Sequence, residues 1–317
     1  MKKLLYIITI ILFLSGCEDV IDVDLKDVEP ILVVDAWLEH TPGEQEIRLT
    51  YTRPYFDNSE AEGISGASVR VLEVQGTSPL DTLVFTETNN GFYTWSPPVA
   101  TDSFGTIGNI YILEVDHNGE KYYSQSTLNP VPKIDSITFR FEEGTEGFFP
   151  DFYAGEFWAR DLPGEGDTYW IKAWKNGVYL NRPSEINIAY DAGFSQGAPV
   201  DNIPFIQPIR DLINPFEEDP GDEYQFLPPY IEEDSVYVQI QSINYEVWFF
   251  LVNVIDETNR PGGFGELFAT PLANVHSNII PEDETNKAVG IFCVSAIDGL
   301  GLKLTSDEVE KAKERAL

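Results

Sequence analysis

Apolar and polar residues alternate over short stretches in the first half of the chain, as they do in half-buried β-strands. Ile47, Leu49 and Tyr51, for example, are separated by the polar residues Arg48 and Thr50. Successive side chains of a strand point to opposite faces, so this pattern predicts one face in a core and one in water. The strands expected on this basis are 31–38, 47–51, 68–71, 83–85, 91–95, 109–115 and 120–125.

These short strands are separated by turn residues, and no helical pattern interrupts them. The last two flank Asp116-His117-Asn118-Gly119, which favours a β-hairpin. Residues 30–130 are therefore expected to form a β-sandwich domain of the immunoglobulin or transthyretin type.

Asn129, Pro130 and Pro132 predict a domain boundary, after which a second β-rich domain is expected over residues 131–302. Its expected strands are 134–141, 169–174, 186–190, 235–243 and 287–297. Residues 191–234 are rich in loops and prolines, and a loop of this length is usually functional or disordered.

Two stretches change to the spacing of a helix. Apolar residues three or four positions apart predict a buried helix near 244–257, with Asn244 as its cap: Trp248, Leu251, Val252 and Ile255. Thr305 and Glu308 have the spacing of a capping box, so a helical tail is expected over residues 303–317.

The N-terminus follows neither pattern. Two lysines precede an apolar run from Leu4 to Leu14, which is shorter than the roughly 20 residues that span a bilayer. Such a run fits the apolar core of an export signal, and Leu14-Ser15-Gly16-Cys17 supplies the small residues and the thiol that a lipoprotein signal peptidase requires. We expect a lipoprotein signal peptide over residues 1–16 and acylation of Cys17. An ordinary signal peptide with a chance cysteine is the alternative.

The net charge limits the partners of the protein. Its 53 acidic and 20 basic residues give a formal charge of −33, and residues 17–29 are expected to form an acidic tether. Such a surface repels phosphate backbones, so nucleic-acid binding is not expected. Hydrophobic residues make up 43% of the chain, which argues against a disordered protein.

Few residues offer catalytic or metal-binding chemistry. Cys293 lies in an apolar run and is expected to be a buried, inert thiol rather than a nucleophile. His40, His117 and His276 lack the spacing of a zinc site, and no phosphate-loop, dinucleotide-binding or nucleophile-elbow motif occurs. The acidic run 217–223 lacks the ligand spacing of a calcium loop and is interpreted as solvated, with cation binding left open. We expect no catalytic residue, no metal ligand and no cofactor.

The chain contains six tryptophans, which can fill a core or stack on a ligand. Core packing is expected for most of them. Trp170 and Trp174 share a strand face with Lys172, so these two are the candidate ligand-stacking residues.

Several segments resemble one family in the same order along nearly the whole mature chain. They are the lipobox at Cys17, Pro30–Leu38, Gly66–Val69, Gly91–Tyr93, Gly108–Tyr111, Val131–Ile137, Pro271–Ile279 and Gly290–Phe292. The chain is similar to the Bacteroidetes outer-membrane lipoproteins catalogued as domain of unknown function 4249. This resemblance implies a lipid-anchored protein on the cell exterior, with Glu18 and Asp19 as the surface-export signal. A solvated linker is the alternative interpretation of these two acids.

The same resemblance implies a partnership with a TonB-dependent transporter of the outer membrane, and it carries over no catalytic residues. The expected function is therefore that of a non-enzymatic, surface-exposed lipoprotein acting as an accessory or binding partner of such a transporter. A stand-alone surface glycan- or peptide-binding module, built from residues around 158–174 and the loop 191–234, is the alternative. A hydrolase that uses two carboxylates is a third hypothesis, since so many acids always offer pairs.

Overall fold

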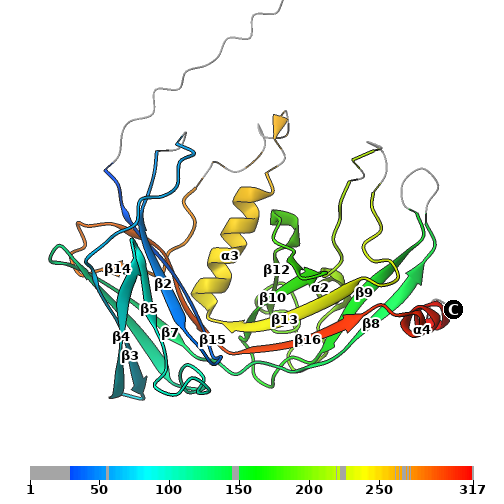
Figure 1. Ribbon diagram of the computed structural model, residues 1–317, viewed down its shortest axis with the longest axis horizontal. Helices are drawn as coiled ribbons and strands as arrows, with labels where there is room; N and C mark the ends of the chain where they lie inside the picture. Colours follow the sequence, from blue (N-terminus) through cyan, green and yellow to red (C-terminus); the bar gives the residue numbers. More distant parts are fainter. Residues whose placement is uncertain are drawn as a thin grey trace, which may run out of the picture.

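The structure is a computed structural model in which residues 29–54, 57–144, 150–218, 220–221, 226–260, 262–263, 265, 269, 271 and 273–315 are described. The described chain is mainly β with a few helices, which confirms the expected fold class. Figure 1 shows a sandwich at one end, a second group of strands at the other, and the helix α3 standing between them.

In the described chain, the first sheet has nine strands in the order β14-β7-β6-β3-β4-β5-β2-β1-β15. Their bounds are β1 (Leu32–Glu39), β2 (Gln45–Tyr51), β3 (Ser68–Gln75), β4 (Ser78–Asn89), β5 (Phe92–Trp95), β6 (Ile110–His117), β7 (Glu120–Thr127), β14 (Ile280–Pro281) and β15 (Ala288–Ser295). The long strand β4 pairs with β3 along one part and with β5 along another. The sheet therefore folds over at β4 into a sandwich around one core.

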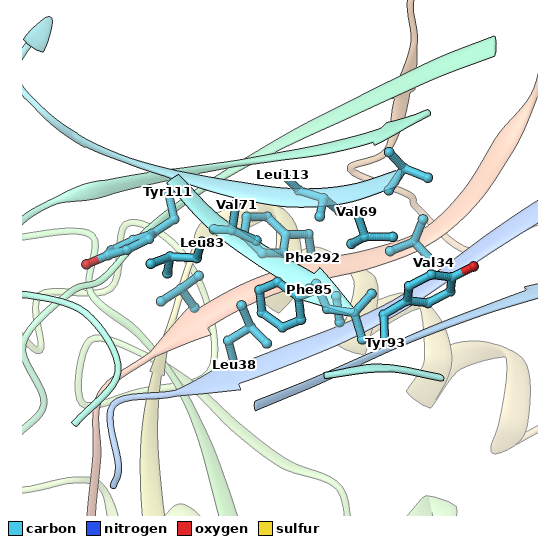
Figure 2. Packing of buried hydrophobic residues seen from close by; sticks show 14 of the residues in the cluster. Val34, Leu38, Val69, Val71, Leu83, Phe85, Tyr93, Tyr111, Leu113 and Phe292 are labelled. Atoms are coloured by element: carbon cyan, nitrogen blue, oxygen red, sulfur yellow. The ribbon is translucent and has the colours of Figure 1, made fainter. Parts of the chain in front are cut away.

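Alternation along the strands builds this core. β1 buries every second residue from Leu32 to Leu38 and leaves Asp35 exposed. Figure 2 shows Phe292 of β15 packed among side chains from both layers, including Val71 and Phe85. Each large apolar side chain that is fully buried in this way contributes about 1.5–3 kcal/mol to folding.

The position of β15 corrects the expected assignment of residues 287–297 to the second region. β15 pairs in parallel with β1 over its whole length and so completes the first sandwich. Its inner face packs in the sandwich core through Phe292, and its outer face packs under α3 through Ile291 and Cys293. Burial on both faces explains why this segment is apolar without alternation. The division of the chain into domains stays a prediction.

The second sheet has the order β11-β10-β13-β16, and β12 pairs with β10. Its strands are β10 (Thr168–Lys175), β11 (Val178–Tyr179), β12 (Asn187–Tyr190), β13 (Ser235–Ile243) and β16 (Ile297–Lys303), and the one-turn helix η1 (Pro183–Glu185) precedes β12. β10 and β13 are antiparallel, with Trp170 opposite Gln241 and Trp174 opposite Tyr237.

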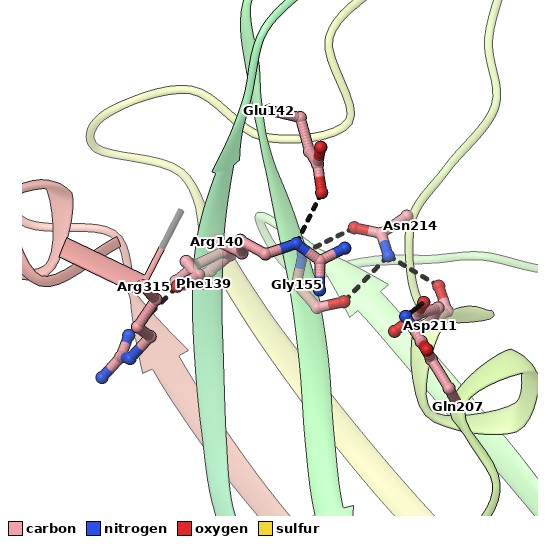
Figure 3. A network of polar contacts seen from close by, with 8 residues as sticks. All are labelled: Phe139, Arg140, Glu142, Gly155, Gln207, Asp211, Asn214 and Arg315. Atoms are coloured by element: carbon pink, nitrogen blue, oxygen red, sulfur yellow. Dashed lines mark hydrogen bonds and ion pairs between the residues drawn. The ribbon is translucent and has the colours of Figure 1, made fainter. Parts of the chain in front are cut away.

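A hairpin and two helices cover one face of the second sheet. The hairpin consists of β8 (Ile134–Glu142) and β9 (Phe152–Ala159), and the helices are α2 (Gln207–Asp211) and α4 (Ser306–Arg315). Figure 3 shows how Asn214 joins α2 to β9: its side chain binds the amide of Gly155 (2.7 Å), the carbonyl of Gly155 (2.8 Å) and the carbonyl of Asp211. Arg315 joins α4 to β8, since it donates a hydrogen bond to the carbonyl of Phe139 at 3.1 Å.

Part of the segment 191–234 is a wall of the second core and not a loop around it. Phe205, Ile209, Ile213 and Tyr230 are fully buried there, and α2 lies within the segment. Phe205, Ile209 and Ile213 are four residues apart, which is the spacing of a helix, although the helix α2 covers only Gln207–Asp211. The tail helix was expected over 303–317, and α4 packs Val309 and Ala312 into the same core.

α3 (Tyr245–Thr258) agrees with the helix expected near 244–257. Asn244 occupies the N-cap position, but its side chain does not cap the helix. Instead its Oδ1 accepts from the amide of Thr127 (3.0 Å) and its Nδ2 donates to Ser126 Oγ (2.8 Å), so it ties α3 to β7. None of the described helices is both long and apolar enough to cross a membrane.

Candidate functional site

The residues expected to carry the lipid anchor and the export signal, Cys17, Glu18 and Asp19, lie outside the described residues. The described chain starts at Glu29 and leads into β1. The start of β1 and the C-terminal end of α3 lie on the same side of the molecule (Figure 1). Acylation of Cys17 therefore stays a prediction.

The two candidate stacking residues lie on one face of β10, as expected, but in different surroundings. Trp170 lies at the junction between the two halves of the molecule. Its ring centroid is 5.1 Å from that of Trp37 on β1, and the amine of Lys172 lies 4.1 Å from the centre of the Trp170 ring. Trp170 also packs against the apolar cluster beneath α3. Trp170 is half-buried at the junction, and its role as a ligand-stacking residue stays a prediction.

A buried polar contact accompanies Trp170 at this junction. Lys172 Nζ is 4.0 Å from Glu39 Oε1, and the side-chain amide of Gln241 donates a short hydrogen bond to the same oxygen. Burial lowers the pKa of Lys172, and the charge of Glu39 opposes this effect. The thiol of Cys293 is fully buried nearby, which raises its pKa to about 12 and leaves it unreactive.

Trp174 belongs to a more open group, which we call the aromatic row: Trp174, Tyr179 and Tyr237. The Trp174 ring centroid is 5.0 Å from that of Tyr179 and 5.4 Å from that of Tyr237. Tyr237 is 41% exposed. Burial and the charge of Glu185 raise the pKa of Tyr179 to about 12, so its hydroxyl stays protonated and can donate a hydrogen bond at neutral pH.

The adjacent strand β16 shapes the aromatic row. A Cβ atom on Gly299 would overlap the hydroxyl of Tyr237, and one on Gly301 would lie 3.5 Å from the same ring. Because both positions are glycine, the Tyr237 ring can lie across β16 with its other face turned outward. The alternation of these glycines with Leu300 and Leu302 is a signal in the sequence that would have pointed to this surface.

The other polar residues singled out in the sequence serve structural contacts. His40 Nδ1 is 2.6 Å from the carbonyl oxygen of Phe104, and His117 Nε2 is 3.0 Å from the hydroxyl of Tyr51. His276 packs against Phe249. Among the described residues, no three His, Cys, Asp or Glu side chains are grouped so that they could hold a metal ion.

The acidic run 217–223 is only partly described, because residues 219 and 222–225 lie outside the described set. Its first residue, Glu217, forms an ion pair with Arg182 at 2.9 Å. A shallow cleft of about 630 Å³ lies here, lined by both residues and by Phe216, Glu218, Pro220, Phe226 and Leu227.

A second acidic group was not expected from the sequence. Tyr169 donates to Asp161 at 2.7 Å, and Asp191 accepts from the backbone amides of Gly166 and Asp167 at 2.7 and 3.0 Å. Burial, followed by the charges of Asp161 and Asp191, raises the pKa of Asp167 to about 6. Short sequence patterns do not reveal this group, because its members come from two separate loops.

Two comparisons with known proteins bear on the identity of the chain. The comparison with curated proteins found no match. The family described as Domain of unknown function (DUF4249) matches residues 18–299, which include nearly all the described strands of both sheets and the helix α3. This match starts at the residue that follows Cys17. Since it covers most of the chain, the protein belongs to the DUF4249 family.

Proposed function

We propose that this protein is a non-enzymatic lipoprotein on the outer surface of the outer membrane, where it acts as an accessory or binding partner of a TonB-dependent transporter. The observation that carries the proposal is the family match over residues 18–299. It supports the resemblance that first suggested this function, and it starts directly after the residue expected to carry the lipid. Several acyl chains on Cys17 would give stable anchoring, since each buried CH₂ contributes about 0.8 kcal/mol.

Co-purification from native membranes tests this proposal. The full-length protein with a C-terminal tag, expressed in its own cells, is extracted from outer membranes in mild detergent. We expect a TonB-dependent transporter to be enriched with it. The matched control is Cys17→Ala, which should move the protein out of the membrane fraction and abolish the enrichment. A protein that is acylated and surface-exposed, but purifies without a transporter, would contradict the partnership and leave the anchoring intact.

The aromatic row favours a second candidate function, a stand-alone carbohydrate-binding module. An aromatic ring that lies flat and exposed can stack against the apolar face of a sugar, and neighbouring hydroxyl and indole N–H groups can hydrogen-bond to it. Tyr237 provides such a ring, and the half-buried Trp174 packs beside it.

Binding to a soluble β-glucan or xylan, measured for the full-length protein in detergent, tests this candidate. Tyr237→Ala should weaken binding at least tenfold. Tyr245→Ala is the matched control, because Tyr245 is also a half-exposed tyrosine (45%) but lies on α3. Equal losses in both variants, or no binding by the wild-type protein, would eliminate the aromatic row as a sugar site.

A further inference from the structure

A groove crosses the outer face of the first sandwich beside α3. Its floor is formed by outward residues of β1 and β2, among them Asp35, Trp37 and Arg48. Phe250 of α3 and Val275, which is 36% exposed, form part of one wall. The sequence did not indicate this groove, because the apolar run 31–38 predicts only a buried strand.

Two adjoining hollows make up the groove. One has a volume of about 340 Å³ and the other about 410 Å³. Both are lined by Asp35, Trp37 and Arg48, so these three residues form the point where the hollows meet. A ligand that occupies both hollows must extend across these three residues.

The two ends of the groove differ in chemistry. The hollow of about 340 Å³ is mainly apolar, and its lining includes Val33, Phe250, Val275, Val289 and Ile291. The hollow of about 410 Å³ is acidic, because Glu39, Glu44 and Glu46 line it in addition to Asp35. Among the described residues that line both hollows, Arg48 is the one with a positive charge.

The carboxylates at the acidic end have few partners. Within the described part of the chain, the side chains of Asp35, Glu44 and Glu46 form no hydrogen bond or ion pair. Arg48 does not neutralise them as an ion-pair partner, because its guanidinium lies over the ring of Phe92, 5.0 Å from the centroid. Like charges gathered along one groove attract a cation, and electrostatic complementarity of this kind governs both encounter and specificity.

β1 is paired with β15 along its whole length and with β2 from Leu32 to Asp35. A ligand that lies above this face of the sheet is recognised through its side chains. Trp37 adds an aromatic floor, and aromatic faces attract cationic groups.

We propose that this groove binds an extended peptide segment that carries basic side chains next to aliphatic ones. The basic side chains lie among Glu44, Glu46 and Asp35, and the aliphatic ones fill the hollow beside Val275. The charge of the groove and its division into an acidic and an apolar end select this occupant. The site does not depend on the proposed transporter partnership, since it uses only this chain.

Synthetic peptides test the proposal with the full-length protein in detergent. The probe is rhodamine-labelled acetyl-Lys-Arg-Gly-Leu-Ile-Val-amide, together with the same residues in reverse order, and binding is followed by fluorescence anisotropy. Two further peptides replace the basic pair by Glu-Glu or the aliphatic residues by Ser-Ser-Ser. We expect one order of the first peptide to bind at least fivefold more tightly than either replacement, and its affinity to fall as salt rises.

Variants locate the binding. The double variant Glu44→Gln/Glu46→Gln should weaken binding of the first peptide about fivefold. Its matched control is Glu310→Gln/Glu314→Gln, which removes the same charge from exposed positions of α4 and should change affinity less than twofold. Val275→Ser should weaken the aliphatic peptide about threefold and leave the serine-substituted peptide unaffected. Thermal unfolding of each variant verifies that these exposed substitutions leave the fold intact.

Two results would overturn the proposal. If both double variants weaken binding equally, the acidic molecule attracts basic peptides without using the groove. If the serine-substituted peptide binds as tightly as the aliphatic one, the apolar end takes no part. Loss of transporter co-purification with unchanged peptide binding would contradict the proposed function alone.

Discussion

At the scale of single residues, Gly290 shows how closely β15 approaches β1. Its φ of +117° lies in a region that other residues rarely adopt, and a Cβ atom there would overlap the backbone oxygen of Val34. Backbone atoms of a paired strand cannot move aside without breaking the pairing. The pairing of β1 with β15 therefore requires glycine at position 290.

We predict that Gly290→Ala lowers the free energy of unfolding by about 3 kcal/mol, through backbone strain and the loss of pairing between β1 and β15. Chemical denaturation measures the change. Gly76→Ala is the control, because Gly76 also has a positive φ (+61°) but has open space around it, so only the local cost of about 1 kcal/mol is expected. Equal losses in the two variants would show that the contact with Val34 is unimportant.

Asp167 gives a prediction about pH. Its pKa of about 6 in the folded state exceeds the ordinary value of 3.8, because burial and the charges of Asp161, Asp191 and Asp201 disfavour its charged form. Between these two values the folded state holds more protons than the unfolded state, so this group's contribution to stability is lost as pH rises through about 6.

Asp167→Asn removes that titration. We expect a higher melting temperature than wild type at pH 7 and little difference at pH 4, because the wild-type carboxyl is then protonated in the folded protein. Glu310→Gln serves as a control for the change in net charge. A shift of the same size at both pH values would contradict the argument.

At the scale of secondary-structure elements, the sequence predicted what depends on local periodicity. The alternation in 235–243 places Val236, Val238 and Ile240 in one core, as expected, and the helical spacing of 244–257 is found in α3. The partner of an element was not predictable in the same way. β15 pairs with β1, although the two strands lie near opposite ends of the sequence. Asn244 binds β7 instead of capping its own helix. These contacts depend on tertiary structure, which no local pattern records.

The packing of Tyr237 of β13 over the neighbouring strand β16 can be tested by a pair of substitutions. Gly299→Ala should displace the Tyr237 ring and destabilise the protein by about 1–2 kcal/mol, because the added methyl group overlaps the tyrosine hydroxyl. In a Tyr237→Ala background the same change should cost less, which gives a coupling of about 1 kcal/mol in a double-mutant cycle.

Gly301→Ala is the control for this pair, since its Cβ would make only an ordinary contact with the ring at 3.5 Å. Unfolding free energies of all the variants provide the comparison. Additive effects of Gly299→Ala and Tyr237→Ala would mean that the ring already lies away from β16 in solution. That result would also count against the aromatic row as a carbohydrate-binding site.

At the scale of the whole molecule, the candidate sites follow from how the two halves meet. The sequence correctly placed Trp170 and Trp174 on one face of a strand, because the side chains of a strand alternate between its faces. Their role in ligand stacking stays a prediction. The sequence did not show that Trp170 would pack against Trp37, or that β1 and Phe250 of α3 would line one hollow, because both depend on residues far apart in the chain. Identifying such surfaces requires the arrangement of the two sheets.

The junction itself provides the last prediction. Glu39 on the first sheet contacts Lys172 and Gln241 on the second, and the side chain of Lys172 is only 15% exposed. The Glu39 side chain is 33% exposed, and removing its charge leaves the more buried charge of Lys172 without compensation. Glu39→Gln keeps an acceptor for Gln241 but removes the negative charge, so we expect it to destabilise the protein by about 1–2 kcal/mol.

If the charge of Lys172 is the cause, the cost of Glu39→Gln should nearly vanish in a Lys172→Met background, where no buried cation needs a partner. Denaturation of the two single variants and the double variant measures this directly. A cost that is the same in both backgrounds would contradict an electrostatic link between the halves. The packing of Trp37 on Trp170 and the hydrogen bonds of Asn244 to β7 would then be what holds the two sheets together.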